Sequence, residues 1–201
     1  MIARVRAAAA RVFSRHPRSA LIVAACSFAI LILAILDNSG AFGYPGSDCR
    51  RFDQKAFKVA RCVNGDTIVI IDDDKGAETT VHLLGVDAPR LPTDHWFEQS
   101  KKYTMARTAN RTVTLRLEPI QSRNERGELL AYVFITDGDN LNADIIRDGQ
   151  AYADRRVKHT FASQFSVAEN EARMKPRGLW ANPRDDQMPA WRREWLRSLK
   201  K

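Results

Sequence analysis

The spacing of apolar and polar residues divides the chain into an apolar N-terminal run and a longer segment with strand-like alternation. Residues 19–36, SALIVAACSFAILILAIL, carry no charged side chain. Because about 20 apolar residues span a bilayer, this run predicts a transmembrane anchor. A cleaved secretory signal is the alternative, with Ser39-Gly40-Ala41 as its cleavage site. A buried core helix would need a polar face, which the run lacks.

The strand-like alternation begins at Phe57 and continues to residue 84, with Asn64-Gly65 as a strong hairpin turn. The later periodicities predict helices over 94–110, 141–149 and 163–175, and strands over 112–118 and 129–135. Strands joined by short hairpins and followed by helices are typical of an α+β fold. We therefore predict a small antiparallel β-barrel that carries helices.

Five segments follow from these patterns. They are a basic tail over 1–18, the anchor over 19–36, a linker over 37–56, the barrel domain over 57–181 and a C-terminal helix over 182–201. The linker is predicted from its dense Asp, Asn, Ser, Gly and Pro residues.

The C-terminal helix is basic and rich in tryptophan. Met188, Trp191, Trp195 and Leu199 fall on one helical stripe with arginines and lysines beside it. Two interpretations are open. The stripe either lies on an anionic membrane surface, where Trp and basic residues are favoured, or packs its tryptophans on the barrel.

Charge is concentrated at the two ends of the chain. The first 18 residues hold five arginines and no acid, so the positive-inside rule predicts a cytoplasmic N-terminus and a domain outside the cytoplasm. In a bacterium this is the periplasmic side, and a mitochondrial presequence is the alternative address. Between residues 37 and 183 basic and acidic residues are equal in number, so the net charge of +8 gives the domain no support as a nucleic-acid-binding surface.

The three cysteines do not have the spacing of a zinc site. Cys26 lies in the apolar run, whereas Cys49 and Cys62 lie in the segment predicted to be exported, where disulfides persist. A Cys49–Cys62 bridge and two free thiols are both open, because spacing does not determine connectivity.

Two acids stand at strand ends and carry the candidate chemistry. Asp66 follows the Asn64-Gly65 turn, and Asp87 precedes Ala88-Pro89. Carboxylates on neighbouring strand ends can hold a hard divalent cation, so Asp66 and Asp87 are candidate Ca²⁺ ligands. The alternative is that both acids only shape their turns.

Five segments in order resemble the staphylococcal-nuclease-like (thermonuclease) family: NGDT, LLGVDAP, GELLAYVF, LNADIIRDGQA and AENEARMKPRGLW. The resemblance covers about residues 57–181. It implies a five-stranded OB-fold barrel with three helices and an ancestral Ca²⁺-dependent phosphodiesterase acting on DNA and RNA. It places the family's metal carboxylates on Asp66 and Asp87, and the backbone carbonyl of Ala88 remains as a third ligand.

Three further positions depart from the family pattern. His82 and Glu128 stand where the family has its two phosphate-binding arginines, and Arg90 stands where it has the general-base glutamate. Arg90 cannot accept a proton, and Glu128 would repel a phosphate. Since loss of one such group lowers a rate by roughly 10²–10⁴, we expect no catalytic residues here. We also hypothesise that Arg90 and Glu128 form an ion pair across the old active site.

These inferences predict a membrane-anchored, nuclease-like OB domain with lost or strongly impaired phosphodiesterase activity that acts as a binding or scaffolding module. Two alternatives remain: an active Ca²⁺-dependent nuclease with altered catalytic residues, and an OB-fold domain that binds oligosaccharides or peptides. The partner is accordingly a protein, a glycan or, with weaker support, a nucleic acid.

Overall fold

The computed structural model of the chain describes residues 17–38, 45–72, 76–119, 121–135 and 138–199. It forms two compact units, Met1–Ser47 and Asp48–Lys201. The described part of the first unit is dominated by α2 (Pro17–Asn38), which contains the predicted anchor. Among the described residues, no helix has both the length and the apolar character needed to cross a membrane. The anchor over 19–36 stays a prediction from the sequence, and most of the basic tail lies outside the described residues.

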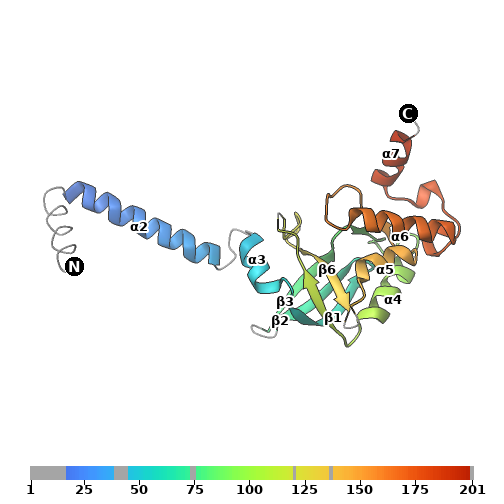
Figure 1. Cartoon of the computed structure of the whole chain (residues 1–201), viewed down its shortest axis with the longest axis horizontal. Helices are drawn as coiled ribbons and strands as arrows, with labels where there is room; N and C mark the ends of the chain where they lie inside the picture. The colour runs from blue at the N-terminus through green and yellow to red at the C-terminus, as the bar shows by residue number, and fades with distance from the viewer. Residues whose placement is uncertain (1–16, 39–44, 73–75, 120, 136–137, 200–201) are drawn as a thin grey trace. The chain divides into compact units, whose positions relative to one another are not determined.

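The second unit is built around a closed five-stranded barrel with the strand order β1-β2-β3-β6-β5 (Figure 1). Its strands are β1 (Ala56–Asn64), β2 (Thr67–Asp72), β3 (Ala77–Leu83), β5 (Thr112–Arg116) and β6 (Leu129–Ile135). A separate two-stranded ladder joins β4 (Val86–Asp87) to β7 (Tyr152–Ala153). The α+β barrel predicted from the sequence is confirmed.

The sequence predicted an antiparallel barrel, but one pair of its strands is parallel. β3 and β6 pair in parallel, with Val81 opposite Leu129 and Leu83 opposite Ala131. This pair is separated in the chain by α4 and β5. A long connection of this kind allows a strand to return in the same direction, which a tight hairpin does not.

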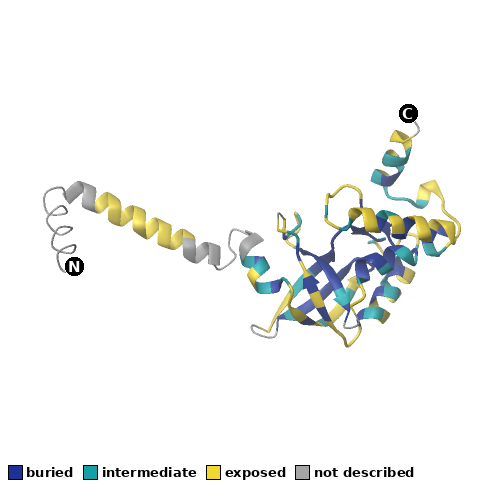
Figure 2. Cartoon of the chain, viewed as in Figure 1, coloured by how far each residue is buried: buried dark blue, intermediate teal, exposed yellow. Residues whose placement is uncertain are grey.

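The barrel interior is filled by alternate apolar residues. Ile68 and Ile70 of β2 and Val81 and Leu83 of β3 are fully buried, and Figure 2 shows the buried residues concentrated in the barrel strands and the helix faces against them. A period of two residues puts these side chains on one face of each strand. β2 begins directly after Asp66, and β3 ends one residue after His82. Because β2 and β3 are antiparallel, both residues lie at one end of the barrel.

The other helices among the described residues are α3 (Pro45–Phe52), α4 (Phe97–Thr108), α5 (Leu141–Arg147), α6 (Ala162–Met174) and α7 (Ala190–Ser198), with short 3-10 turns η1 (Gly178–Trp180) and η2 (Asp185–Gln187). Of these helices, α4 packs against β1 and α5 against β6. α3 lies inside the stretch predicted as a linker. Its last residue, Phe52, is fully buried in the core, and its Asp48 pairs with Arg123 at 2.8 Å, so the predicted linker from Asp48 onward belongs to the domain.

One buried amide ties the helices to the strand that leads to the candidate site. Asn142 of α5 is fully buried. Its Oδ1 accepts from the Val133 backbone N–H at 2.9 Å, and its Nδ2 donates to the carbonyl oxygens of Leu84 and Ala131 at 3.0 and 3.1 Å. Since Leu84 begins the turn into β4, this amide fixes the start of the segment that carries Asp87.

Two glycines cross at close range where the domain closes. Gly149 and Gly178 both have positive φ, 70° and 52°. A Cβ added at Gly149 would lie 2.2 Å from the Arg177 carbonyl oxygen, and one added at Gly178 would lie 2.2 Å from the Gly149 carbonyl oxygen. The chain leaves this crossing toward η2 and α7.

Candidate functional site

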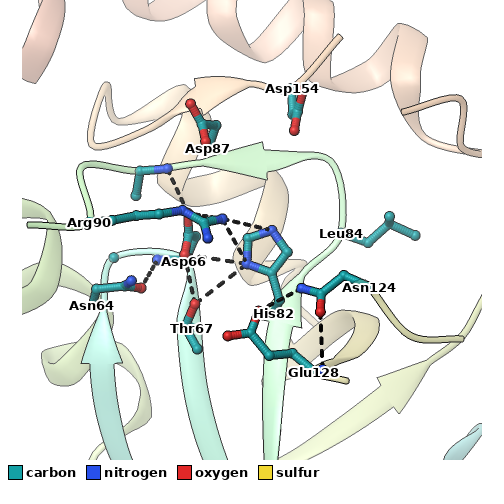
Figure 3. A network of polar contacts seen from close by, with 12 residues as sticks. Asn64, Asp66, Thr67, His82, Leu84, Asp87, Arg90, Asn124, Glu128 and Asp154 are labelled. Carbon is teal, nitrogen blue, oxygen red and sulfur yellow. Dashed lines mark hydrogen bonds and ion pairs between the residues drawn. The ribbon is translucent and has the colours of Figure 1, made fainter. Parts of the chain in front are cut away.

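The five residues singled out by the sequence gather at one end of the barrel. Asp66 directly precedes β2, His82 lies on β3 opposite Thr67, and Asp87 ends β4. Arg90 follows in the next loop, and Glu128 directly precedes β6. Figure 3 shows them together, with Arg90, His82 and Thr67 converging on Asp66.

Asp66 is fully buried, and both of its oxygens are already bonded. Oδ1 accepts from the Thr67 hydroxyl at 2.7 Å and lies 3.3 Å from Nδ1 of His82. Oδ2 accepts from the Ala88 backbone N–H at 2.8 Å and lies 3.4 Å from an Arg90 guanidinium nitrogen. The acid therefore joins β2, β3 and the loop after β4.

The Arg90 guanidinium lies against the His82 ring. Its Nη2 is 3.5 Å from Nδ1 and 3.4 Å from Nε2 of the imidazole. Nearly equal distances to both ring nitrogens place the guanidinium across the ring and not in line with one lone pair. Arg90 thus brings a fixed positive charge to Asp66.

The pKa of Asp66 reflects these partners. Burial raises the pKa, but the hydrogen bond and charge of His82, the charge of Arg90 and the Ala88 N–H outweigh it. The result is a pKa below the usual range of an aspartate, so Asp66 is a carboxylate near neutral pH.

Asp87 is nearly buried and is bonded from two other directions. Its Oδ1 accepts from Arg156 Nη2 at 3.1 Å, and its Oδ2 accepts from the Trp191 indole N–H at 2.9 Å. Arg156 also bonds Asp154, at 2.8 and 2.9 Å. Burial raises the pKa of Asp87, and this outweighs the lowering by Trp191 and Arg156.

Glu128 does not pair with Arg90, and that part of the sequence interpretation is wrong. Within the described part of the chain, its Oε2 accepts from Arg126 at 2.7 Å and from the Asn124 side-chain amide at 2.6 Å. The Arg126 hydrogen bond lowers the pKa of Glu128. Arg90 instead faces Asp66, because a fully buried carboxylate requires a nearby cation more strongly than a partly exposed one does.

The residues present do not fit a calcium ion. Ca²⁺ takes six to eight oxygen ligands at about 2.3–2.6 Å, whereas the oxygens of Asp66 and Asp87 are held by N–H and O–H donors and two arginines. Among the described residues, no group of three or more His, Cys, Asp or Glu side chains is placed to hold a metal ion. The Asp66 and Asp87 oxygens that the sequence predicted as Ca²⁺ ligands are therefore engaged by other partners within the described part of the chain.

A cavity of about 790 Å³ opens beside this site. The loop after β4 forms one wall, with Arg90 and Leu91 among its residues, and the segment from Asp186 to Pro189 forms another. Asp87 and Tyr152 also line it. Its lining combines apolar and charged side chains, as ligand pockets usually do.

Sequence reasoning missed several partners. Trp191 lies 104 positions from Asp87 in the chain, and only its place on the C-terminal stripe signalled it. Arg155 and Arg156 form ion pairs with buried acids. His159 is half-buried, with Nδ1 3.1 Å from the Tyr132 hydroxyl.

Cys49 and Cys62, for which the sequence left a disulfide open, are free thiols. The Cys62 thiol contacts the Asn64 carbonyl oxygen at 3.0 Å, and burial raises its pKa to about 11.

Comparisons with known proteins bear on the family of the chain. The model of the family described as staphylococcal nuclease homologue matches residues 80–182. An uncharacterized endonuclease of Escherichia coli O157:H7 is 31% identical over 136 residues, which are 67% of this chain and 81% of the relative. The thermonuclease of Staphylococcus hyicus is 24% identical over 168 residues, or 81% and 96% of the two chains. A micrococcal nuclease of Shigella flexneri is 28% identical over 145 residues, or 68% and 79%.

Proposed function

Because the chain belongs to the family of staphylococcal nuclease homologues, we propose that it is a member whose phosphodiesterase activity is lost or strongly impaired. On this proposal the domain is a binding or scaffolding module. The observation that carries it is the Arg90–Asp66 ion pair, in which a guanidinium stands at the family's general-base position and neutralises one of the two metal carboxylates.

The chemistry of phosphodiester hydrolysis supports the proposal. A general base must accept a proton from water, and a guanidinium does not do so at any ordinary pH. Cations must also face the charge that develops on the phosphate. Glu128 instead places a carboxylate at one of the two positions, and His82 lacks the bidentate fork of an arginine.

A role in binding draws its support from the cavity beside the old site. Its volume of about 790 Å³ is in the range of small-molecule and peptide sites. The OB fold is used for ligands of several classes, so the domain binds a protein, glycan or nucleic-acid partner without cleaving it.

The deciding experiment is a cleavage assay on the purified full chain. Single-stranded DNA and RNA are incubated with the protein in the presence of Ca²⁺ and, in parallel, of a chelator. We expect no calcium-dependent cleavage above the rate of a matched Asp66→Ala variant. Calcium-dependent cleavage that Asp66→Ala abolishes would show the alternative, an active nuclease with altered catalytic residues.

A parallel binding assay separates the partner classes. Retention of labelled single-stranded DNA or RNA on the uncleaving protein, lost with rising salt, would identify a nucleic-acid-binding module. Absence of both cleavage and nucleic-acid binding would favour a protein or glycan partner.

Membrane attachment is a second element of the proposal and draws its support from the sequence alone. The uncharged run over 19–36 follows five arginines, which is typical of an anchor with a cytoplasmic N-terminus. Alkaline extraction of membranes tests it: the full chain should remain in the pellet, and a chain beginning at residue 42 should not.

A further inference from the structure

Three buried N–H groups where α7 contacts α6 and η1 have no acceptor among the described residues. They are Nε and Nη2 of Arg192 and Nε1 of Trp180. The Arg192 guanidinium carbon lies 4.8 Å from the Trp180 ring centroid, so the three donors belong to one small region. We propose that this region is a binding site for a small monovalent anion of the halide class. The inference goes beyond the proposed function, because the site takes no part in phosphodiester chemistry.

Donors buried in this way are rarely left without a partner. Arg192 has no exposed surface, and Trp180 is 7% exposed. A buried donor without an acceptor carries the full desolvation penalty of that group, and proteins satisfy nearly all such groups with their own atoms or with a bound species. The rings of Tyr152 and Trp180 attract the Arg192 charge, but they supply no acceptor for the Trp180 indole N–H. A bound species is therefore expected at these donors.

The charge around the donors favours an anion over a water molecule. The Glu169 carboxylate is fully buried, and it accepts from Arg192 at 2.8 Å and from Arg155 at 3.2 Å. One carboxylate therefore serves two guanidinium groups. Arg173 adds a third cation, with its guanidinium carbon 5.4 Å from the Trp180 ring centroid, and it has no ion pair among the described residues.

The neighbouring acids do not cancel this excess of positive charge. Asp87 and Asp154 are both held by Arg156, at 3.1 and 2.8 Å. Four arginines therefore face three carboxylates, and the unbalanced charge lies on the Glu169 side. A buried charge is stabilised by a counter-ion, and a neutral water molecule does not provide one.

The number and burial of the donors limit the size of the anion. Three donors suffice for an ion of one atom. A phosphate or sulfate would bring further oxygens, and the described residues leave those without donors. A chloride bonded to Arg192 and Trp180 joins α7 to η1, so the ion would help to keep α7 docked on the domain.

The test measures chloride binding by the full chain through its effect on stability. Urea denaturation is followed at constant ionic strength while gluconate is replaced by chloride, up to about 100 mM. We expect the folding equilibrium constant to rise about 10-fold along a saturating curve, as binding to the folded state alone requires. Trp180→Phe keeps a ring beside Arg192 but removes the indole donor. It should reduce the gain to about 2-fold, because losing one hydrogen bond to an ion weakens binding about 10-fold.

Two further variants sharpen the test. Trp191→Phe is the matched control, because it makes the same chemical change at an indole whose N–H already donates to Asp87, and it should keep the full gain. Glu169→Gln removes the carboxylate that two arginines share. It should bind chloride about 10-fold more tightly, because the local positive charge increases. A site that holds water predicts no such increase.

Equal stability of the unsubstituted protein in chloride and in gluconate would show that the donors hold water and would overturn the proposal. An undiminished gain in Trp180→Phe, or an equal reduction in Trp191→Phe, would place the anion elsewhere and would also overturn it. If Trp180→Phe does not fold, as judged by circular dichroism, crystals of the full chain soaked in bromide decide. An anomalous peak beside Arg192 and Trp180 supports the site, and its absence rejects it. Nuclease activity is not measured, so failure of this proposal and failure of the proposed function are separate outcomes.

Discussion

The surroundings of Asp66 and Asp87 differ, although the sequence predicted both acids as ligands of one metal ion. Asp66 is held by residues of the barrel and its adjacent loop, and its pKa is lowered. Asp87 is held by Arg156 and by Trp191 of α7, and its pKa is raised by burial. One acid is compensated by side chains of the barrel and its adjacent loop, whereas the other contacts a segment from the C-terminal part of the chain.

The largest expected effect concerns the buried ion pair between Arg192 of α7 and Glu169 of α6. Glu169→Gln keeps the shape of the side chain but leaves the Arg192 cation uncompensated in a fully buried position. We expect a loss of about 3 kcal/mol in the free energy of unfolding, measured by urea denaturation. Glu171→Gln, on the same helix and half-exposed, is the control and should change stability by less than about 0.5 kcal/mol. Equal losses for the two variants would contradict a role for the Glu169 charge.

The second prediction concerns Asp66. Asp66→Asn removes a buried charge from His82 and Arg90, and we expect a loss of about 2 kcal/mol at neutral pH. Because the folded pKa of Asp66 lies below its unfolded value, its contribution is present above pH of about 4 and is lost as pH falls through the folded pKa. The stability difference between variant and unsubstituted protein should therefore shrink with acid, as followed by denaturation at several pH values. A difference independent of pH would show that Asp66 is not paired as a carboxylate.

Asp87 should respond to pH with the opposite sign. Its folded pKa lies above the unfolded value, so its contribution is present below the unfolded pKa and is lost as pH rises through the folded pKa. In Asp87→Asn this loss is absent, and the stability of the variant relative to the unsubstituted protein should rise as pH increases from about 4 toward neutral. The same denaturation series measures it. Parallel pH profiles for Asp66→Asn and Asp87→Asn would remove the distinction between the two acids.

The smallest effect tests the partner of Glu128. A double-mutant cycle of Arg126→Ala with Glu128→Ala should give a coupling of about 0.5 kcal/mol, as expected for a partly exposed pair. The cycle of Arg90→Ala with Glu128→Ala should give a coupling near zero. A larger coupling free energy in the second cycle would support the Arg90–Glu128 ion pair that the sequence analysis hypothesised.

Much of the barrel was predictable because its strands have regular burial. β6 begins and ends where the apolar run 129–135 does, and α5 follows the predicted helix closely. α3 was missed because its Pro, Gly, Ser and Asp residues resemble a linker, while its contribution to folding rests on Phe52 and Asp48, whose partners are distant in sequence. The parallel β3–β6 pair was missed because the direction of pairing depends on the connection between two strands and not on the alternation of side chains within each strand.

The candidate site was predictable in its membership but not in its pairing. Motif spacing brought Asp66, His82, Asp87, Arg90 and Glu128 to one end of the barrel. Spacing does not rank competing partners, so it did not show that Glu128 would bond Arg126, two residues away. The Trp191–Asp87 hydrogen bond depends on how α7 docks, for which a helical stripe allows several surfaces.

The crossing of Gly149 and Gly178 has a consequence for how sequences of this kind can vary. Each glycine leaves no room for a side chain because of the backbone at or next to the other, so enlarging one residue cannot be relieved by shrinking its neighbour. A saturation-mutagenesis scan should find both positions intolerant, with no second-site suppressor at the partner position. The chain runs from this crossing to α7, whose Trp191 donates to Asp87. A replacement at residue 178 would therefore alter the surroundings of Asp87 without contacting it.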